Sequence, residues 1–74
     1  MRISYDAEVD VLYIRFLEKT VTTQHITEGI SVDYAADGHI AGIEILDAVN
    51  RFGDPEVFRK VILEDVGLTK HVSI

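Results

Sequence analysis

The fold is decided by the stretch Val11-Leu12-Tyr13-Ile14-Arg15-Phe16-Leu17. Alternate residues of an extended strand point to opposite faces of a sheet. One face of this strand carries Leu12, Ile14 and Phe16, and the other carries Tyr13, Arg15 and Leu17. Because the first set is wholly apolar, we expect it to face the core of a small β-sheet.

Further strands are predicted on both sides of this stretch. Apolar and polar residues alternate before it and again after it, and clusters of turn-forming residues separate these segments. The segment 20–26 is rich in β-branched residues but mixed in polarity, which is typical of an irregular edge strand. The predicted segments are 3–5, 20–26, 30–34 and 39–46, with turns at 6–10 and 35–38.

The last of these strands contains an anomaly in its spacing. Ile40 and Ile43 are three residues apart, whereas Ile43 and Ile45 are two apart, so strict alternation cannot place all three on one face. A β-bulge inserts one extra residue and restores the register. We therefore predict a bulge at Ala41-Gly42, a position that also gives the glycine a reason to be there.

Helical signals follow the last strand. Asp47 resembles an N-cap for a short turn over 48–50, and Asp54-Pro55-Glu56 is a stronger helix start. Apolar residues at helical spacing come next, and Gly67 is a plausible stop. The remaining residues, 68–74, are left open between a strand and a tail. The expected fold is α+β: an antiparallel sheet of about four strands with one C-terminal helix packed on one face.

Composition narrows the class of protein. The chain has 74 residues, 7 basic against 13 acidic, and a formal net charge of −6, which disfavours binding to nucleic acid or anionic lipid. It has no cysteine, so disulfides and thiolate metal sites are excluded. It also lacks the apolar run of about 18 residues that a membrane-spanning helix needs. We expect a single cytoplasmic domain over residues 1–74 that gains stability by association.

Two blocks of sequence resemble a known family. The first is Tyr5-Asp6-Ala7-Glu8-Val9-Asp10-Val11-Leu12-Tyr13-Ile14, and the second runs from Glu28 to Tyr34 and from Asp37 to Ala48. In order and spacing they are similar to the YuzE-like family, domain of unknown function 2283, over about residues 3–50. The resemblance implies no established activity. It does suggest an antitoxin-like role, because some members look like partners of small putative toxins encoded nearby.

The acidic run Asp6, Glu8 and Asp10 invites a metal hypothesis. Read as an EF-hand loop from Asp6, it has Val11 at the glycine position and Leu17 at the position of the last carboxylate, so it fails that test. Three carboxylates on an extended chain could still converge on one ion. A structural turn explains the same residues without a metal, because Asp is a favoured turn residue. We assign no metal-binding, cofactor-binding or catalytic residue.

A second candidate surface lies on the sheet face opposite the predicted core. Hairpin pairing is expected to bring two carboxylates, an arginine and a tyrosine together there. Such a group could do acid–base chemistry, or it could be a solvated or interfacial charge pattern. Aromatic residues and arginine are enriched where proteins meet. The candidate interaction surface consists of Tyr13, Arg15, Leu17, Asp33 and Glu44.

The sequence therefore predicts an acidic, non-enzymatic interaction protein. Its expected partners are a second copy of itself, in a homodimer, and a small basic protein, with inhibition of a basic toxin as one concrete form. Two alternatives stay open. One is a small metal-dependent or acid–base enzyme that uses the clustered carboxylates, and the other is a structural homo-oligomer. The three histidines, His25, His39 and His71, fall in separate segments and indicate no zinc site.

Overall fold

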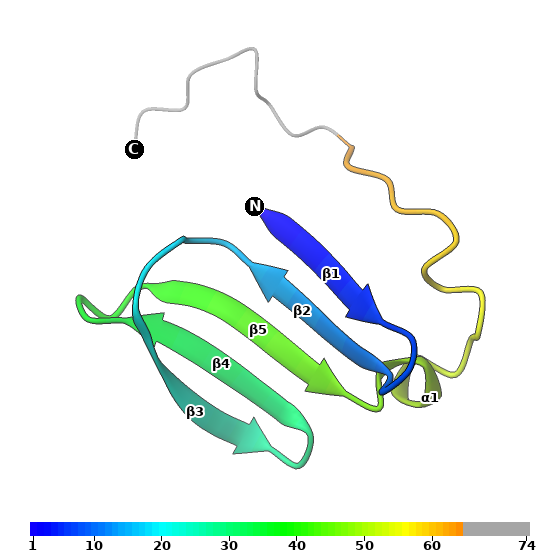
Figure 1. Cartoon of the computed structure of the whole chain (residues 1–74), viewed down its shortest axis with the longest axis horizontal. Helices are drawn as coiled ribbons and strands as arrows, with labels where there is room; N and C mark the ends of the chain where they lie inside the picture. The colour runs from blue at the N-terminus through cyan, green and yellow to red at the C-terminus, as the bar shows by residue number, and fades with distance from the viewer. Residues whose placement is uncertain (65–74) are drawn as a thin grey trace.

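The computed structural model describes residues 1–64, which form one five-stranded sheet and one short helix (Figure 1). The strands lie in the order β1-β2-β5-β4-β3, and every neighbouring pair is antiparallel. The elements are β1 (Arg2–Asp6), β2 (Val11–Arg15), β3 (Val21–Thr27), β4 (Ile30–Ala35), β5 (Ile40–Leu46) and α1 (Ala48–Phe52).

The α+β class and the antiparallel sheet predicted from the sequence are confirmed, with five strands in place of about four. All five segments with strand patterning form strands, because each has a partner with which to complete its backbone hydrogen bonds. The mixed-polarity segment is the edge strand β3, and its register to β4 shifts between His25 and Thr27. It is therefore the irregular edge strand that its composition indicates.

The predicted β-bulge in β5 is also confirmed. Asp33 lies opposite Gly42, but the next residue of β4, Tyr34, lies opposite Ile40, so Ala41 is the extra residue. The bulge brings Ile40 onto the same face as Ile43 and Ile45, as their uneven spacing requires.

The bulge also ends β2 earlier than predicted. The alternating stretch was expected to continue to Leu17, but β2 stops at Arg15. The carbonyl oxygen of Ala41 accepts the N–H groups of both Phe16, at 2.7 Å, and Leu17, at 3.1 Å. Two successive N–H groups on one acceptor turn the chain away from the regular ladder. The connection to β3 then passes across the ends of β5 and β4 (Figure 1).

The predicted helix from Asp54 onward is wrong over the described residues. Asp54 accepts the N–H of Glu56 through its carboxylate, and the chain makes only isolated turns before it extends. Valine and isoleucine, which dominate the apolar positions of that segment, are mediocre helix formers, and a helix that is not held by packing is marginal. The expected stop at Gly67 and the open segment 68–74 lie outside the described residues.

The helix forms instead at Ala48–Phe52, immediately after β5. Asp47 is its N-cap residue, as predicted, but its side chain makes no capping bond to the backbone: its backbone is left-handed, with φ of 55°, and its carboxylate accepts a hydrogen bond from the Asn50 side chain. Asp10, in the turn between β1 and β2, supplies the caps from a distance. Its carbonyl accepts the Ala48 N–H at 3.0 Å, and its carboxylate accepts the Val49 N–H at 2.9 Å.

The strand registers divide the side chains between two faces. We call one the apolar face and the other the polar face. At paired strand positions, the apolar face consists of Ile3, Tyr5, Leu12, Ile14, Thr22, Gln24, Thr27, Ile30, Val32, Tyr34, Ile40, Ile43 and Ile45. The polar face includes Arg2, Ser4, Asp6, Val11, Tyr13, Arg15, Val21, Thr23, His25, Ser31, Asp33, Ala35, Gly42, Glu44 and Leu46.

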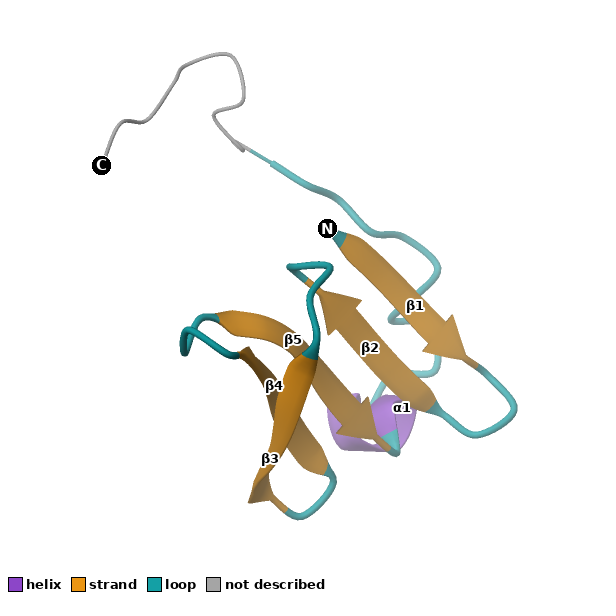
Figure 2. Ribbon diagram, turned by 60° about the vertical axis from the view of Figure 1, so that its left-hand side comes forward, coloured by secondary structure: helices purple, strands orange, loops and turns teal. Residues whose placement is uncertain are grey.

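The sheet is a twisted single layer, with α1 behind the ends of β2 and β5 (Figure 2). Over residues 1–64, no large side chain is fully buried, and the buried apolar residues are Leu12 and three alanines. The helix is too short to cover the apolar face, as a longer C-terminal helix was expected to do. None of the helices in this part of the chain is long and apolar enough to cross a membrane.

Candidate functional site

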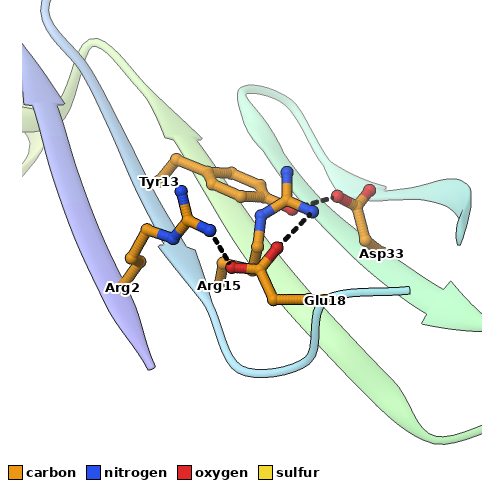
Figure 3. Close-up of polar contacts among 5 residues, drawn as sticks. All are labelled: Arg2, Tyr13, Arg15, Glu18 and Asp33. Carbon is orange, nitrogen blue, oxygen red and sulfur yellow. Dashed lines mark hydrogen bonds and ion pairs between the residues drawn. The ribbon is translucent and has the colours of Figure 1, made fainter. Parts of the chain in front are cut away.

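A side-chain bridge crosses the middle strand on the polar face (Figure 3). The Tyr13 hydroxyl, from β2, donates to Asp33 Oδ2 in β4 at 2.5 Å, and so spans β5, which lies between them. Thr23, from β3, donates to the other carboxylate oxygen of Asp33 at 2.6 Å. The Asp33 carboxylate therefore links side chains from β2 and β3 through β4.

Gly42 makes room for this bridge. It lies in β5 opposite both Arg15 of β2 and Asp33 of β4, so the Tyr13 ring passes directly over it. A Cβ atom built on Gly42 would overlap the Tyr13 hydroxyl and its ring carbon, and would press on the carbonyl of Ile14. The prediction that Gly42 occupies a bulge is confirmed, and the close approach of Tyr13 is the reason that the residue is a glycine.

Basic side chains border the bridge. The Arg15 guanidinium lies 5.1 Å from the centre of the Tyr13 ring, in a cation–π arrangement. Glu18, from the connection after β2, pairs with Arg2 and lies 3.8 Å from Arg15 (Figure 3). Since Glu18 and Arg2 are largely exposed, these ion pairs are screened by solvent and add little to stability.

The bridge alters the acidity of its members. Hydrogen bonds from the hydroxyls of Thr23 and Tyr13 hold the pKa of Asp33 below its usual range, because they favour the charged carboxylate. The same bond raises the pKa of the Tyr13 hydroxyl, since Asp33 holds its proton and repels the phenolate. The resting state is thus a charged Asp33 with a neutral Tyr13.

The register brings together four of the five residues predicted for the interaction surface. Glu44 lies opposite Tyr13 on one side and Ser31 on the other, on the same face as Arg15 and Asp33. Leu17 lies beyond the end of β2, half-buried in the connection to β3. The role of these five residues in binding stays a prediction. Thr23 and Glu18 were not anticipated, although the polar alternation of β3 could have indicated Thr23.

The acidic turn between β1 and β2 is occupied by internal hydrogen bonds. Asp6 accepts the N–H of Glu8 at 3.0 Å, and Asp10 accepts the Tyr5 hydroxyl at 2.7 Å in addition to the Val49 N–H. These two contacts lower the pKa of Asp10, that of the backbone N–H most strongly. Within residues 1–64, no group of three or more His, Asp or Glu side chains is placed to hold a metal ion.

The described histidines each contact one neighbour. His25 lies 2.9 Å from the Ser31 hydroxyl, and His39 lies 2.9 Å from the Asp37 carboxylate. Asp37 has a lowered pKa, chiefly because of its hydrogen bonds from His39. His71 lies outside the described residues.

Among the described residues, the apolar face is covered only near the turn between β1 and β2. There Tyr5 stacks on Phe58, with ring centres 4.1 Å apart, and Phe52 meets Phe58 edge-on at 6.0 Å. At the opposite end of the sheet, Ile3 is 44% exposed and Ile40 is 50% exposed. Within residues 1–64, the apolar face therefore has a second layer at one end and lies open at the other.

Comparison with protein families gives one match. Residues 2–48 match the model of a family described as protein of unknown function (DUF2283). The chain belongs to this family. No curated protein and no solved structure was found to match the chain.

The extent of the family match coincides with the sheet. Residues 2–48 contain all five strands and the first residue of α1. The segment that covers one end of the apolar face, with Phe52 and Phe58, lies outside the match. The matched residues thus include the whole sheet of this chain but not Phe52 and Phe58, which cover one end of its apolar face.

Proposed function

We propose that this member of DUF2283 is a non-enzymatic interaction protein that acts by burying its apolar sheet face against another protein. The observation that carries the proposal is the apolar face itself. Stable domains bury such a face under a second layer of structure, and within residues 1–64 that layer is present only beside Tyr5 and Phe58. Exposed apolar surfaces of this kind mark sites of protein association.

The charge distribution supports a basic partner. Five acidic residues lie in the turns and strand ends at the end of the sheet that adjoins α1: Asp6, Glu8, Asp10, Glu28 and Asp47. The β1–β2 turn and the β3–β4 turn lie at this same end (Figure 1). These carboxylates lie at the opposite end of the sheet from the exposed Ile3 and Ile40, so they would act at long range, attracting a basic protein and speeding its association. Inhibition of a small basic toxin in the cytoplasm is one form of this proposal.

Affinity purification from the native host tests the proposal when two forms of the protein are compared. We expect the wild type to retain a basic protein at low ionic strength, and Ile40→Lys, which places a charge on the apolar face, to retain much less of it. Retention should weaken as salt screens the acidic end. If both forms retain the same proteins equally, the apolar face is not the contact surface and the proposal is wrong.

A further inference from the structure

We infer that, in the isolated protein, a second copy of this chain covers the apolar face, so that two sheets pack face to face in a homodimer. The inference rests on the proposed function and names the occupant of the face. It differs from an association through Tyr13 and Leu17, because it places the polar face on the outside.

The absence of charge on the apolar face is the first reason. At its paired strand positions within residues 2–46, this face carries no Asp, Glu, Lys, Arg or His. The whole chain has a net charge of −6, yet two copies meeting on this face bring no charged strand side chains into contact. An uncharged face can therefore pack against its own copy without like-charge repulsion.

The shape of the sheet is the second reason. β5 is the middle strand of five, and Ile43 lies in the middle of β5 on the apolar face. A two-fold axis near Ile43 would stack β5 on its counterpart. Sheets with the same twist pack well when their strands are nearly aligned, at about 30° and about 10 Å apart. A dimer about this axis is therefore a β-sandwich with one sheet from each copy.

The size of the face is the third reason. Five strands about 4.8 Å apart and about five residues long give each copy a face of roughly 400 Å² in projection. Accessible surface exceeds projected area on a face covered by side chains, so a pair would bury roughly 1,000–1,500 Å² in total, which is the size of small specific interfaces. Ile3 and Ile40 are the exposed isoleucines of this face within residues 1–64, at the end away from Phe58.

A matched pair of substitutions on β5 tests the inference. Ile40→Lys places a charge on the apolar face, and Leu46→Lys places the same charge on the polar face at a similarly exposed position, 43% against 50%. Both substitutions make the net charge less negative, so added repulsion between acidic chains cannot explain dissociation. Light scattering at about 10 µM should give twice the 8.3 kDa chain mass for the wild type and Leu46→Lys. Ile40→Lys should dissociate at least tenfold more readily.

A dye that fluoresces on exposed apolar surface, 1-anilinonaphthalene-8-sulfonate, separates this inference from the proposed function. If the wild type is a dimer and the dye does not fluoresce, both the homodimer and the proposed function are supported. If the wild type is a monomer that raises the dye fluorescence, and Ile40→Lys abolishes that signal, the homodimer is wrong but the apolar face remains the proposed binding surface. If the wild type is a monomer and the dye does not fluoresce, both the homodimer and the proposed function are wrong.

Two further outcomes keep the test decisive. A dimer that Ile40→Lys leaves intact would place the contact elsewhere, for example at the free edge of β3, and would overturn the inference. If Ile40→Lys fails to fold, the wild type still provides a test. The denaturant midpoint of a dimer rises with protein concentration, whereas that of a monomer does not, and a constant midpoint would overturn the inference.

Discussion

The two faces of the sheet solve the problem of burial in opposite ways. On the polar face, Tyr13, Thr23 and Asp33 complete one another's hydrogen bonds within the chain, and Asp33 is 9% exposed. On the apolar face, Ile3 and Ile40 remain half-exposed, although burying an isoleucine side chain contributes about 1.5–3 kcal/mol. The buried polar groups of the polar face are thus satisfied by hydrogen bonds within the chain. The apolar face instead requires another layer of structure to cover it.

The largest effect on stability is expected from Gly42→Val, which disrupts the hydrogen-bonded bridge on the polar face. The new side chain would displace the Tyr13 ring and leave the buried Asp33 carboxylate without one of its two hydroxyl donors. We expect a loss of about 3 kcal/mol in the free energy of unfolding, measured by chemical denaturation at one protein concentration.

The double variant Gly42→Ala with Tyr13→Phe provides the control. Phenylalanine lacks the hydroxyl that the Cβ would strike, so the glycine substitution should cost less in this background than in the wild type. Equal costs in the two backgrounds would mean that the Tyr13 hydroxyl is not what requires a glycine.

A smaller effect on stability is expected from Asp10→Ala, which weakens the attachment of α1 and of the segment after it to the apolar face. The substitution removes the acceptor of the Val49 N–H and the Tyr5 hydroxyl but keeps the backbone carbonyl that accepts the Ala48 N–H, so α1 is held less firmly to the turn. We expect the melting temperature to fall by about 5 °C. Glu8→Ala is the control, two residues away in the same turn, and should change it little. Equal effects would show that the turn sequence matters and the cap does not.

The smallest effect is expected from acid. The pKa of Asp33 is lower in the folded chain than in the unfolded chain, so its contribution to stability is present above about pH 4 and is lost as the pH falls toward the folded value. Denaturant midpoints should hold from pH 7 to 5 and decline below pH 4. The difference between the wild type and Asp33→Asn should shrink over the same range. A constant difference would contradict the role of the charged carboxylate.

Local patterns predict the strands because each strand is recognisable from its own residues. The bulge followed from three isoleucines alone, and the edge strand from its mixed polarity. Helix position could not be predicted in this way, because the cap of α1 comes from Asp10, 39 residues from the N–H that it accepts. Phe58 similarly leaves a helical pattern to stack on Tyr5. Such contacts depend on the tertiary arrangement.

The candidate site was predictable in part for the same reason. Alternation places Tyr13, Arg15, Asp33 and Glu44 on one face, and the register confirms that placement. The hydrogen bond from Tyr13 to Asp33 joins strands that are not neighbours, and Gly42 was the available signal for it. The exposure of the apolar face was not predicted, because a C-terminal helix was expected to cover it.

In the inferred dimer, the apolar face is buried against a second copy while the polar face stays outside. The most direct test uses the adjacent residues Ile43 and Glu44, which lie in the middle of β5 on opposite faces. The chain has no cysteine, so Ile43→Cys or Glu44→Cys introduces a single thiol. A bis-maleimide whose reactive groups are about 8–10 Å apart suits the spacing of packed sheets. Mass spectrometry should find a cross-linked dimer with Ile43→Cys and monomer with Glu44→Cys. A cross-linked dimer with Glu44→Cys and not with Ile43→Cys would show that the polar face, and not the apolar face, forms the contact.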